Sequence, residues 1–165
     1  MKRFYPLFFG MGILLALLVS SVLCTGKRVV CNYTDSLPHG IYLICRGTVK
    51  KGDIVVFRPT GVAAKLIGER HYLRPDGFRM KHVAGLPGDS VCADRSYFRV
   101  AGRDYGERAD CDSKGRPLPA YRFCGRLKVG IIVASWGMKN SFDSRYFGPV
   151  ERASIIGIAK PLWIF

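Results

Sequence analysis

The chain has 165 residues, which suits one domain with an additional segment, and 48% of them are hydrophobic, enough for a substantial core. Its 26 basic and 12 acidic residues give a net charge of +14 at pH 7, which favours an anionic partner such as a nucleic acid or a membrane surface. The basic residues are scattered, however, and neither zinc-finger spacing nor an RNP-like motif occurs, so the sequence argues against a nucleic-acid-binding protein.

The N-terminal segment 4–24, FYPLFFGMGILLALLVSSVLC, carries no charge. As a helix it would measure about 31 Å at ~1.5 Å per residue, enough to cross the hydrocarbon core of a bilayer. A cleavable signal peptide is the alternative, but SVLCTGK offers a poor cleavage site, and Leu23 departs from a lipoprotein signal. We therefore predict a cytoplasmic tip and transmembrane anchor in residues 1–25 and one exported domain in residues 26–165.

Residues 32–42, NYTDSLPHGIY, place a serine in a stiff stretch of chain. Pro38 restricts the preceding residue to an extended conformation, and Gly40 permits a sharp exit. Three interpretations of Ser36 are open. It is an ordinary turn residue, a helix cap or a nucleophile held at a fixed angle. Because only 12 positions separate Cys24 from Ser36, the connecting chain reaches at most about 40 Å, so Ser36 must lie near the end of the anchor.

Six cysteines suit an oxidising compartment, in which disulfides persist. No C-x-x-C pair occurs, so a zinc site is not indicated, and we expect no cofactor. Spacing alone does not assign pairs among the cysteines of the exported part, which are Cys31, Cys45, Cys92, Cys111 and Cys124. Cys92 with Cys124, or Cys111 with Cys124, are the candidates, and free buried thiols are the alternative.

Short apolar or alternating runs rich in Val, Ile, Tyr and Phe predict a mostly β domain. The runs lie at 40–45, 53–57, 96–101, 129–136 and 153–159. Turn sequences such as PDG, LPGD and KGRPLP separate them. One helix is predicted in GVAAKLIGERHYL, residues 61–73.

A nucleophilic serine needs a base, and histidine is the usual one. No histidine of this chain lies in a recognisable triad context, and no G-x-S-x-G motif occurs. A neutral lysine is an established substitute. Lys81 lies in the strand-like run FRMKHVAGLPGD with apolar neighbours, although a solvent-facing lysine is the ordinary alternative. To accept a proton, Lys81 would need burial to lower its pKa from ~10.4 toward ~8.

A third stretch, NSFDSRYFGPV at residues 140–150, contains Ser141, Asp143, Ser144 and Arg145 within five positions. Polar side chains this dense between apolar runs are costly to bury unless they are paired with one another. The stretch is either a polar loop with a structural ion pair or a set of groups that orients the lysine.

Taken together and in this order, the three stretches resemble the nucleophile, lysine and C-terminal boxes of the serine-lysine signal peptidases. The pattern Ser-x-Pro-x-Gly-x-Tyr, GRPLPAY at 115–121 and the ending GPVERASIIGIAKPLW resemble the conjugative-transfer, or TraF-type, branch more closely. The resemblance runs from the anchor to the C-terminus. It implies a signal-peptidase-like β-fold behind a single N-terminal transmembrane helix.

The resemblance implies a role for each residue of the first two boxes. Ser36 matches the nucleophile, and Lys81 matches the general base. Thr34 stands where the wider family has a hydroxyl that helps the oxyanion hole, beside the backbone N–H of Ser36. His82 departs from the family, because a basic residue, often arginine, follows the lysine there.

The resemblance assigns supporting roles in the third box. Asp143 matches an aspartate that the branch needs for activity, and Ser141 matches a serine that hydrogen-bonds the lysine. A carboxylate in contact with Lys81 would raise the pKa of the lysine, so we predict that Asp143 pairs mainly with Arg145. The run SWGMKN replaces the Gly-Asp-Asn run of the general enzymes, which leaves the substrate range open.

The implied protein is a single-pass inner-membrane serine endopeptidase with its catalytic domain in the periplasm. Its implied substrate is a pilin precursor of a conjugative transfer system or another membrane-associated preprotein, cleaved by hydrolysis or joined into a cyclic product. Its other expected partner is membrane lipid, and no nucleic acid is expected. A general signal peptidase and an inactive, anchored assembly factor of the transfer apparatus are the alternatives.

Overall fold

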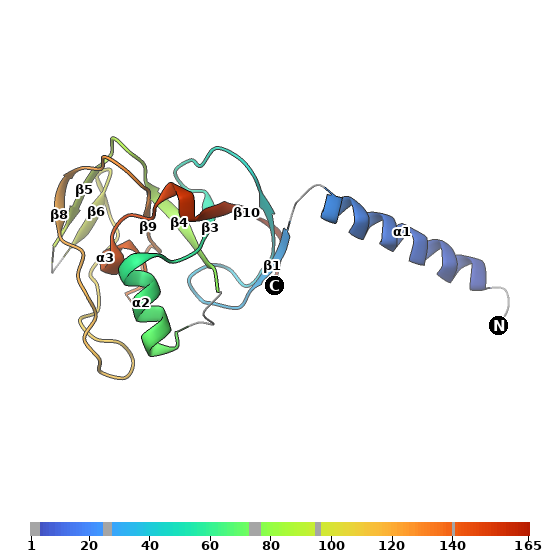
Figure 1. The fold of residues 1–165 in the computed structure, drawn as a ribbon, viewed down its shortest axis with the longest axis horizontal. Coiled ribbons are helices and arrows are strands. Elements are labelled where there is room, and N and C mark those ends of the chain that lie inside the picture. The colour runs from blue at the N-terminus through green and yellow to red at the C-terminus, as the bar shows by residue number, and fades with distance from the viewer. Residues whose placement is uncertain (1–3, 25–27, 73–76, 95–96, 140) are drawn as a thin grey trace.

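The computed structural model describes residues 4–24, 28–72, 77–94, 97–139 and 141–165. Helix α1 extends away from a β-rich domain, and the C-terminus lies beside β1 (Figure 1). The helices are α1 (Tyr5–Cys24), α2 (Gly61–Arg70), α3 (Ser144–Phe147) and the 3-10 turn η2 (Arg152–Ser154). The strands are β1 (Arg28–Asn32), β2 (Gly40–Cys45), β3 (Ile54–Phe57), β4 (Arg79–Gly85), β5 (Ser90–Ala93), β6 (Phe98–Val100), β7 (Arg103–Asp104), β8 (Phe123–Arg126), β9 (Ile132–Val133) and β10 (Ile155–Ile164).

The strands form two antiparallel sheets, which confirms the mostly β prediction. The larger sheet has the order β1-β2-β10-β3-β4-β9, and the smaller has the order β7-β6-β5-β8. Strand β10 lies between β2 and β3 in the larger sheet and pairs with both of them. The loop that carries Ser36 joins β1 to β2, and Lys81 lies on β4. Both residues are therefore positioned by the same sheet.

Apolar side chains cover both faces of the larger sheet at its centre. Successive residues of a strand face opposite sides, and Val55 and Val56 on β3 are both fully buried. Val56 packs in a cluster with Met80 and Tyr42, whereas Val55 packs in another cluster with Val83. The side chains of Met80 and Lys81, which pair with Val56 and Val55, therefore lie beside apolar residues on opposite faces of the sheet.

The predicted elements mostly form, with different ends. The runs at 40–45, 53–57, 96–101 and 153–159 contain β2, β3, β6 and the start of β10, and α2 occupies most of 61–73. His71 ends α2 because it adopts a left-handed conformation, with φ of 53°. In the run 129–136 only Ile132 and Val133 form strand β9, because β9 pairs only with the C-terminal part of β4, at Val83 and Gly85. Residues 73, 96 and 140 of the predicted stretches lie outside the described residues.

One of the two candidate disulfides forms. Cys92 on β5 and Cys124 on β8 lie directly opposite each other in the smaller sheet and are bonded. The alternative pairing of Cys111 with Cys124 is wrong, because Cys111 lies in a loop and keeps a free thiol. Cys31 and Cys45 are free as well.

The N-terminal apolar segment forms helix α1, and its described side chains are exposed. Within the part of the chain that the structure describes, no helix combines the length and the apolar character needed to cross a membrane. The transmembrane prediction is therefore not confirmed.

Candidate active site

The loop between β1 and β2 is organised by the buried amide of Asn32. Its Nδ2 donates to the backbone carbonyls of Thr34 at 2.9 Å, Leu37 at 3.0 Å and Pro38 at 3.1 Å. Its Oδ1 accepts a hydrogen bond of 2.7 Å from the Thr34 hydroxyl. These contacts span the whole turn around Ser36, so one side chain fixes the path of the loop. Asn32 was not predicted as a site residue from the sequence, although an asparagine at a strand end is a common turn former.

The Ser36 hydroxyl lies beside Thr34, at 3.4 Å between Oγ and Oγ1. Thr34 has a single hydroxyl proton and donates it to Asn32, so Thr34 is an acceptor at Ser36 in this structure. To donate to a developing negative charge, Thr34 would have to release Asn32. Thr34 therefore lies beside Ser36, but as an acceptor rather than as a donor.

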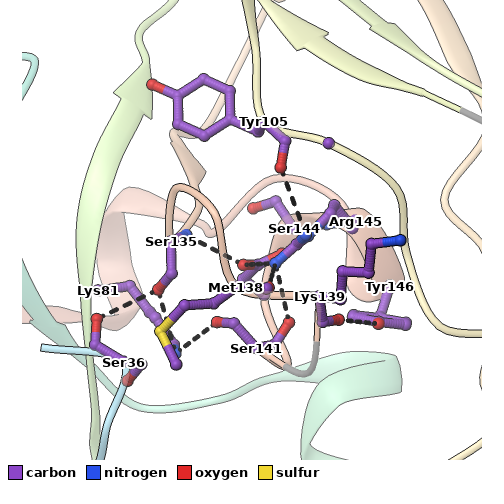
Figure 2. Close-up of polar contacts among 12 residues, drawn as sticks. Ser36, Lys81, Tyr105, Ser135, Met138, Lys139, Ser141, Ser144, Arg145 and Tyr146 are labelled. Carbon is purple, nitrogen blue, oxygen red and sulfur yellow. Dashed lines mark hydrogen bonds and ion pairs between the residues drawn. The ribbon is translucent and has the colours of Figure 1, made fainter.

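Lys81 is buried in the middle of β4, with 3% of its surface exposed. It pairs with Val55 across the sheet, so its stem lies along an apolar face. Its Nζ donates to Ser141 Oγ at 2.7 Å and to Ser135 Oγ at 3.5 Å, as Figure 2 shows. The predicted contact of Lys81 with Ser141 is confirmed, whereas Ser135 was missed because it lies inside an apolar run.

The surroundings of Lys81 destabilise its charged form. Burial lowers the pKa of Lys81 to about 8, the negative charge of Asp143 opposes this shift, and the positive charges of Arg79 and Arg145 add to it. The shift has the direction that a lysine base requires. At pH 7 about a tenth of the molecules would then hold a neutral amine at this position.

Asp143 and Arg145 form a fully buried ion pair, as predicted. Arg145 Nε lies 2.9 Å from Asp143 Oδ1, and Nη2 lies 2.9 Å from Oδ2, in a two-pronged contact. The exposed fractions are 0% for Asp143 and 1% for Arg145. Arg145 also donates to the carbonyls of Glu107 at 2.9 Å and Met138 at 2.6 Å. The charged groups of the pair thus all have hydrogen-bond partners. Arg145 also joins the start of α3 to the loops that contain Glu107 and Met138. Figure 2 shows Arg145 between Tyr105 and Ser141.

Ser36 and Lys81 line one cleft of about 500 Å³. Its wall consists of Thr34, Asp35, Ser36, Tyr72, Arg79, Lys81, Ala109, Cys111, Asp112, Ser113, Leu118, Met138, Ser141, Phe142 and Tyr146. Among the described residues no hydrogen bond joins Ser36 Oγ to Lys81 Nζ. Catalytic contacts are commonly long before substrate binds. His82 contacts the carbonyl of Gly52 at 3.2 Å, and none of these lining residues is a histidine.

Comparison with known proteins places this arrangement in a family. Residues 2–164 match the family described as signal peptidase, peptidase S26. The chain is 33% identical to the plasmid transfer protein TraF of Escherichia coli over 158 residues, 88% of each chain. It is 31% identical to the conjugal transfer protein TraF of Agrobacterium fabrum over 175 residues, 99% of this chain and 98% of that one.

A further relative comes from outside the transfer proteins. The chain is 33% identical to the probable signal peptidase I-2 of a Synechocystis species over 113 residues, 67% of this chain and 46% of that one. Three findings agree on the family of this chain. They are the buried lysine in the cleft that Ser36 lines, the family match over almost the whole chain and the two relatives among the transfer proteins. The protein belongs to the signal peptidase family, peptidase S26, and is a TraF-type member of it.

Proposed function

We propose that the protein is a membrane-anchored serine endopeptidase that matures the pilin precursor of a conjugative transfer system. The observation that carries the proposal is the buried Lys81, hydrogen-bonded to Ser141 in the cleft that Ser36 also lines. The relatives named as plasmid and conjugal transfer proteins support the transfer context. The family match supports peptide-bond chemistry.

In the proposed reaction Lys81 acts as the base. Its neutral amine takes the proton of Ser36 Oγ while Oγ attacks the scissile carbonyl carbon, so a C–O bond forms and the carbonyl oxygen becomes an anion. When this intermediate collapses, the C–N bond breaks, and the Lys81 ammonium returns the proton to the leaving amine. Water then attacks the acyl-enzyme, or an amine of the same substrate attacks and closes a ring. Lys81 removes the proton of the attacking group, and Ser36 regains it.

Thr34 is the proposed second donor to the oxyanion, beside the Ser36 backbone N–H. Thr34→Val removes the hydroxyl and keeps the shape, so we expect kcat to fall about 10²-fold, near the lower end for loss of one such donor. Thr34→Ser keeps the hydroxyl and should retain most of the activity. Steady-state kinetics on a precursor peptide check both variants. Equal activity in the two variants would mean that Thr34 only packs in the loop.

We further propose that α1 attaches the domain to the inner membrane with the cleft in the periplasm. Residues 4–24 carry no charge, and large apolar side chains of α1 such as Leu7, Phe8 and Leu15 are exposed. Exposed apolar surface of this extent calls for a covering partner, and lipid is the one that fits. Ser36 follows α1 closely in the chain, so substrates cleaved just outside a membrane would be within its reach.

Cells that make the pilin precursor with and without this protein test the proposal. We expect mass spectrometry to find a shortened pilin only with the protein, and a cyclic product would be lighter than the linear one by one water. After alkaline extraction the protein should stay in the membrane pellet, with its C-terminal domain open to protease in spheroplasts. An unprocessed precursor would contradict the peptidase proposal, and a protein in the extract would contradict the anchor.

A general signal peptidase is the second candidate, favoured by the similarity to the probable signal peptidase I-2. It would use the same cleft on many precursors. Rescue of bulk secretion in a host depleted of its own signal peptidase would support this candidate. Processing confined to the pilin would exclude it.

A further inference from the structure

Ser135 connects the three motifs, although it belongs to none of them. It follows β9, and only 2% of its surface is exposed. Its hydroxyl lies 3.4 Å from the backbone oxygen of Ser36 and 3.5 Å from Lys81 Nζ. Its backbone N–H donates to Asp143 Oδ2 at 3.1 Å. The nucleophile loop, the lysine strand and the ion pair therefore all meet at one buried serine (Figure 2).

The proton of the Ser135 hydroxyl fixes the direction of these contacts. A serine has one hydroxyl proton, and Ser135 donates it to the carbonyl of Ser36. At Lys81, Ser135 can consequently only accept. A neutral Lys81 amine has two N–H groups and one lone pair. If Ser135 and Ser141 accept from the two N–H groups, the lone pair is left for the Ser36 hydroxyl.

The backbone around Ser135 is held from two sides. On one side, Ala134 donates its N–H to the carbonyl of His82 at 3.0 Å, which ties the segment to β4 next to Lys81. On the other side, Asp143 holds the Ser135 N–H and is itself clamped by Arg145. Asp143 can therefore influence the position of Ser135, and through it the site, without contacting the lysine amine directly.

We propose that Ser135 is a positioning residue that aims the Lys81 amine at Ser36 and holds the Ser36 loop against β4. The proposal rests on the proposed Ser-Lys peptidase function. It adds that a hydroxyl outside the three motifs sets the relative placement of nucleophile and base, and that Asp143 acts on the site through this residue.

The test compares Ser135→Ala with Ser144→Ala. Both variants remove a buried serine hydroxyl, but the Ser144 hydroxyl accepts from the backbone N–H of Val133 at 2.9 Å. Among the hydrogen bonds of the described residues, none joins the Ser144 hydroxyl to Ser36 or Lys81. Lysine labelled with ¹³C at Cε, assigned with Lys81→Met, reports the titration of Lys81 by NMR. Steady-state kinetics on a precursor peptide report kcat and KM. Circular dichroism confirms the fold of each variant, and Ser135→Cys replaces Ser135→Ala if the alanine variant does not fold.

We expect Ser135→Ala to lower kcat about 10- to 100-fold with KM nearly unchanged, because the peptide still binds but the amine is misaligned. The Lys81 titration should move to lower pH, since the ammonium loses an acceptor and the charged form is less stabilised. Ser144→Ala should leave the Lys81 titration at its wild-type position. Ser135→Thr retains the hydroxyl and should recover activity above that of Ser135→Ala.

The results separate this proposal from the proposed function. Ser135→Ala with wild-type kcat and a wild-type Lys81 titration would overturn the role of Ser135 while leaving the peptidase function intact. A shifted titration in Ser135→Ala, together with a wild-type protein that cleaves no precursor, would uphold the contact of Ser135 with Lys81 and overturn the peptidase function.

Discussion

Replacing Ser36 with alanine should abolish processing of the precursor, with a fall in kcat of about 10⁴-fold or more, because the hydroxyl forms the acyl-enzyme. The fold should survive. Ser36 is only half-buried, and within the described part of the chain its side chain makes a single long hydrogen bond, to Thr34, while Asn32 holds the loop. Quantitative mass spectrometry of precursor and product, on variants of equal thermal stability, measures the effect.

The control for this variant is Ser90→Ala, which removes an exposed hydroxyl on β5 away from the cleft and should process the precursor normally. Near-normal processing by a stably folded Ser36→Ala protein would contradict the enzyme proposal. Normal conjugative transfer with Ser36→Ala would favour an inactive assembly factor instead.

Replacing Lys81 with arginine should be as damaging as replacing it with methionine. Arginine keeps the positive charge but does not give up its proton, and methionine has no amine to accept one. Either variant should therefore lose the base and reduce kcat by several orders of magnitude. Activity that persists in Lys81→Arg would transfer the role of base to another residue.

The pH dependence of the wild-type protein supplies the second half of this prediction. Burial lowers the pKa of Lys81 to about 8, so the neutral amine is scarce below that pH and predominates above it. The rate should rise with pH and level off above about 8. The His82→Gln variant should show the same rise of rate with pH, because His82 contacts the Gly52 carbonyl and is not among the cleft residues. Loss of this pH dependence in His82→Gln would contradict the assignment of Lys81 as the base.

Local patterns of the sequence identified Ser36, Lys81 and the polar cluster of the third motif, but not most of the cleft wall, such as Tyr72 and Asp112. A serine before Pro38 and Gly40 and a lysine in an apolar strand are features of a few consecutive residues, and so is the polar cluster that contains Asp143 and Arg145. The pairing of Asp143 with Arg145 was predicted because a carboxylate in contact with Lys81 would raise the pKa of the lysine, and the structure confirms the pair.

The missed features depend on contacts between distant segments. Ser135 stands in an apolar run, and only its approach to Ser36, 99 positions away, reveals a use for its hydroxyl. Strands β1 and β8 were missed because most of their residues are exposed, so they show little apolar alternation. Their partners in the sheets, which sequence patterns do not identify, decide that they are strands.

Detection of the acyl-enzyme tests the central claim most directly. The purified protein, mixed with an excess of an ester of the precursor peptide and quenched in acid, would be analysed by intact-protein and peptide mass spectrometry. We predict a mass increase equal to the acyl part of the substrate, located on the peptide that contains Ser36, and none in Ser36→Ala. Product formation without any adduct on Ser36, at the same rate in Ser36→Ala, would contradict the claim.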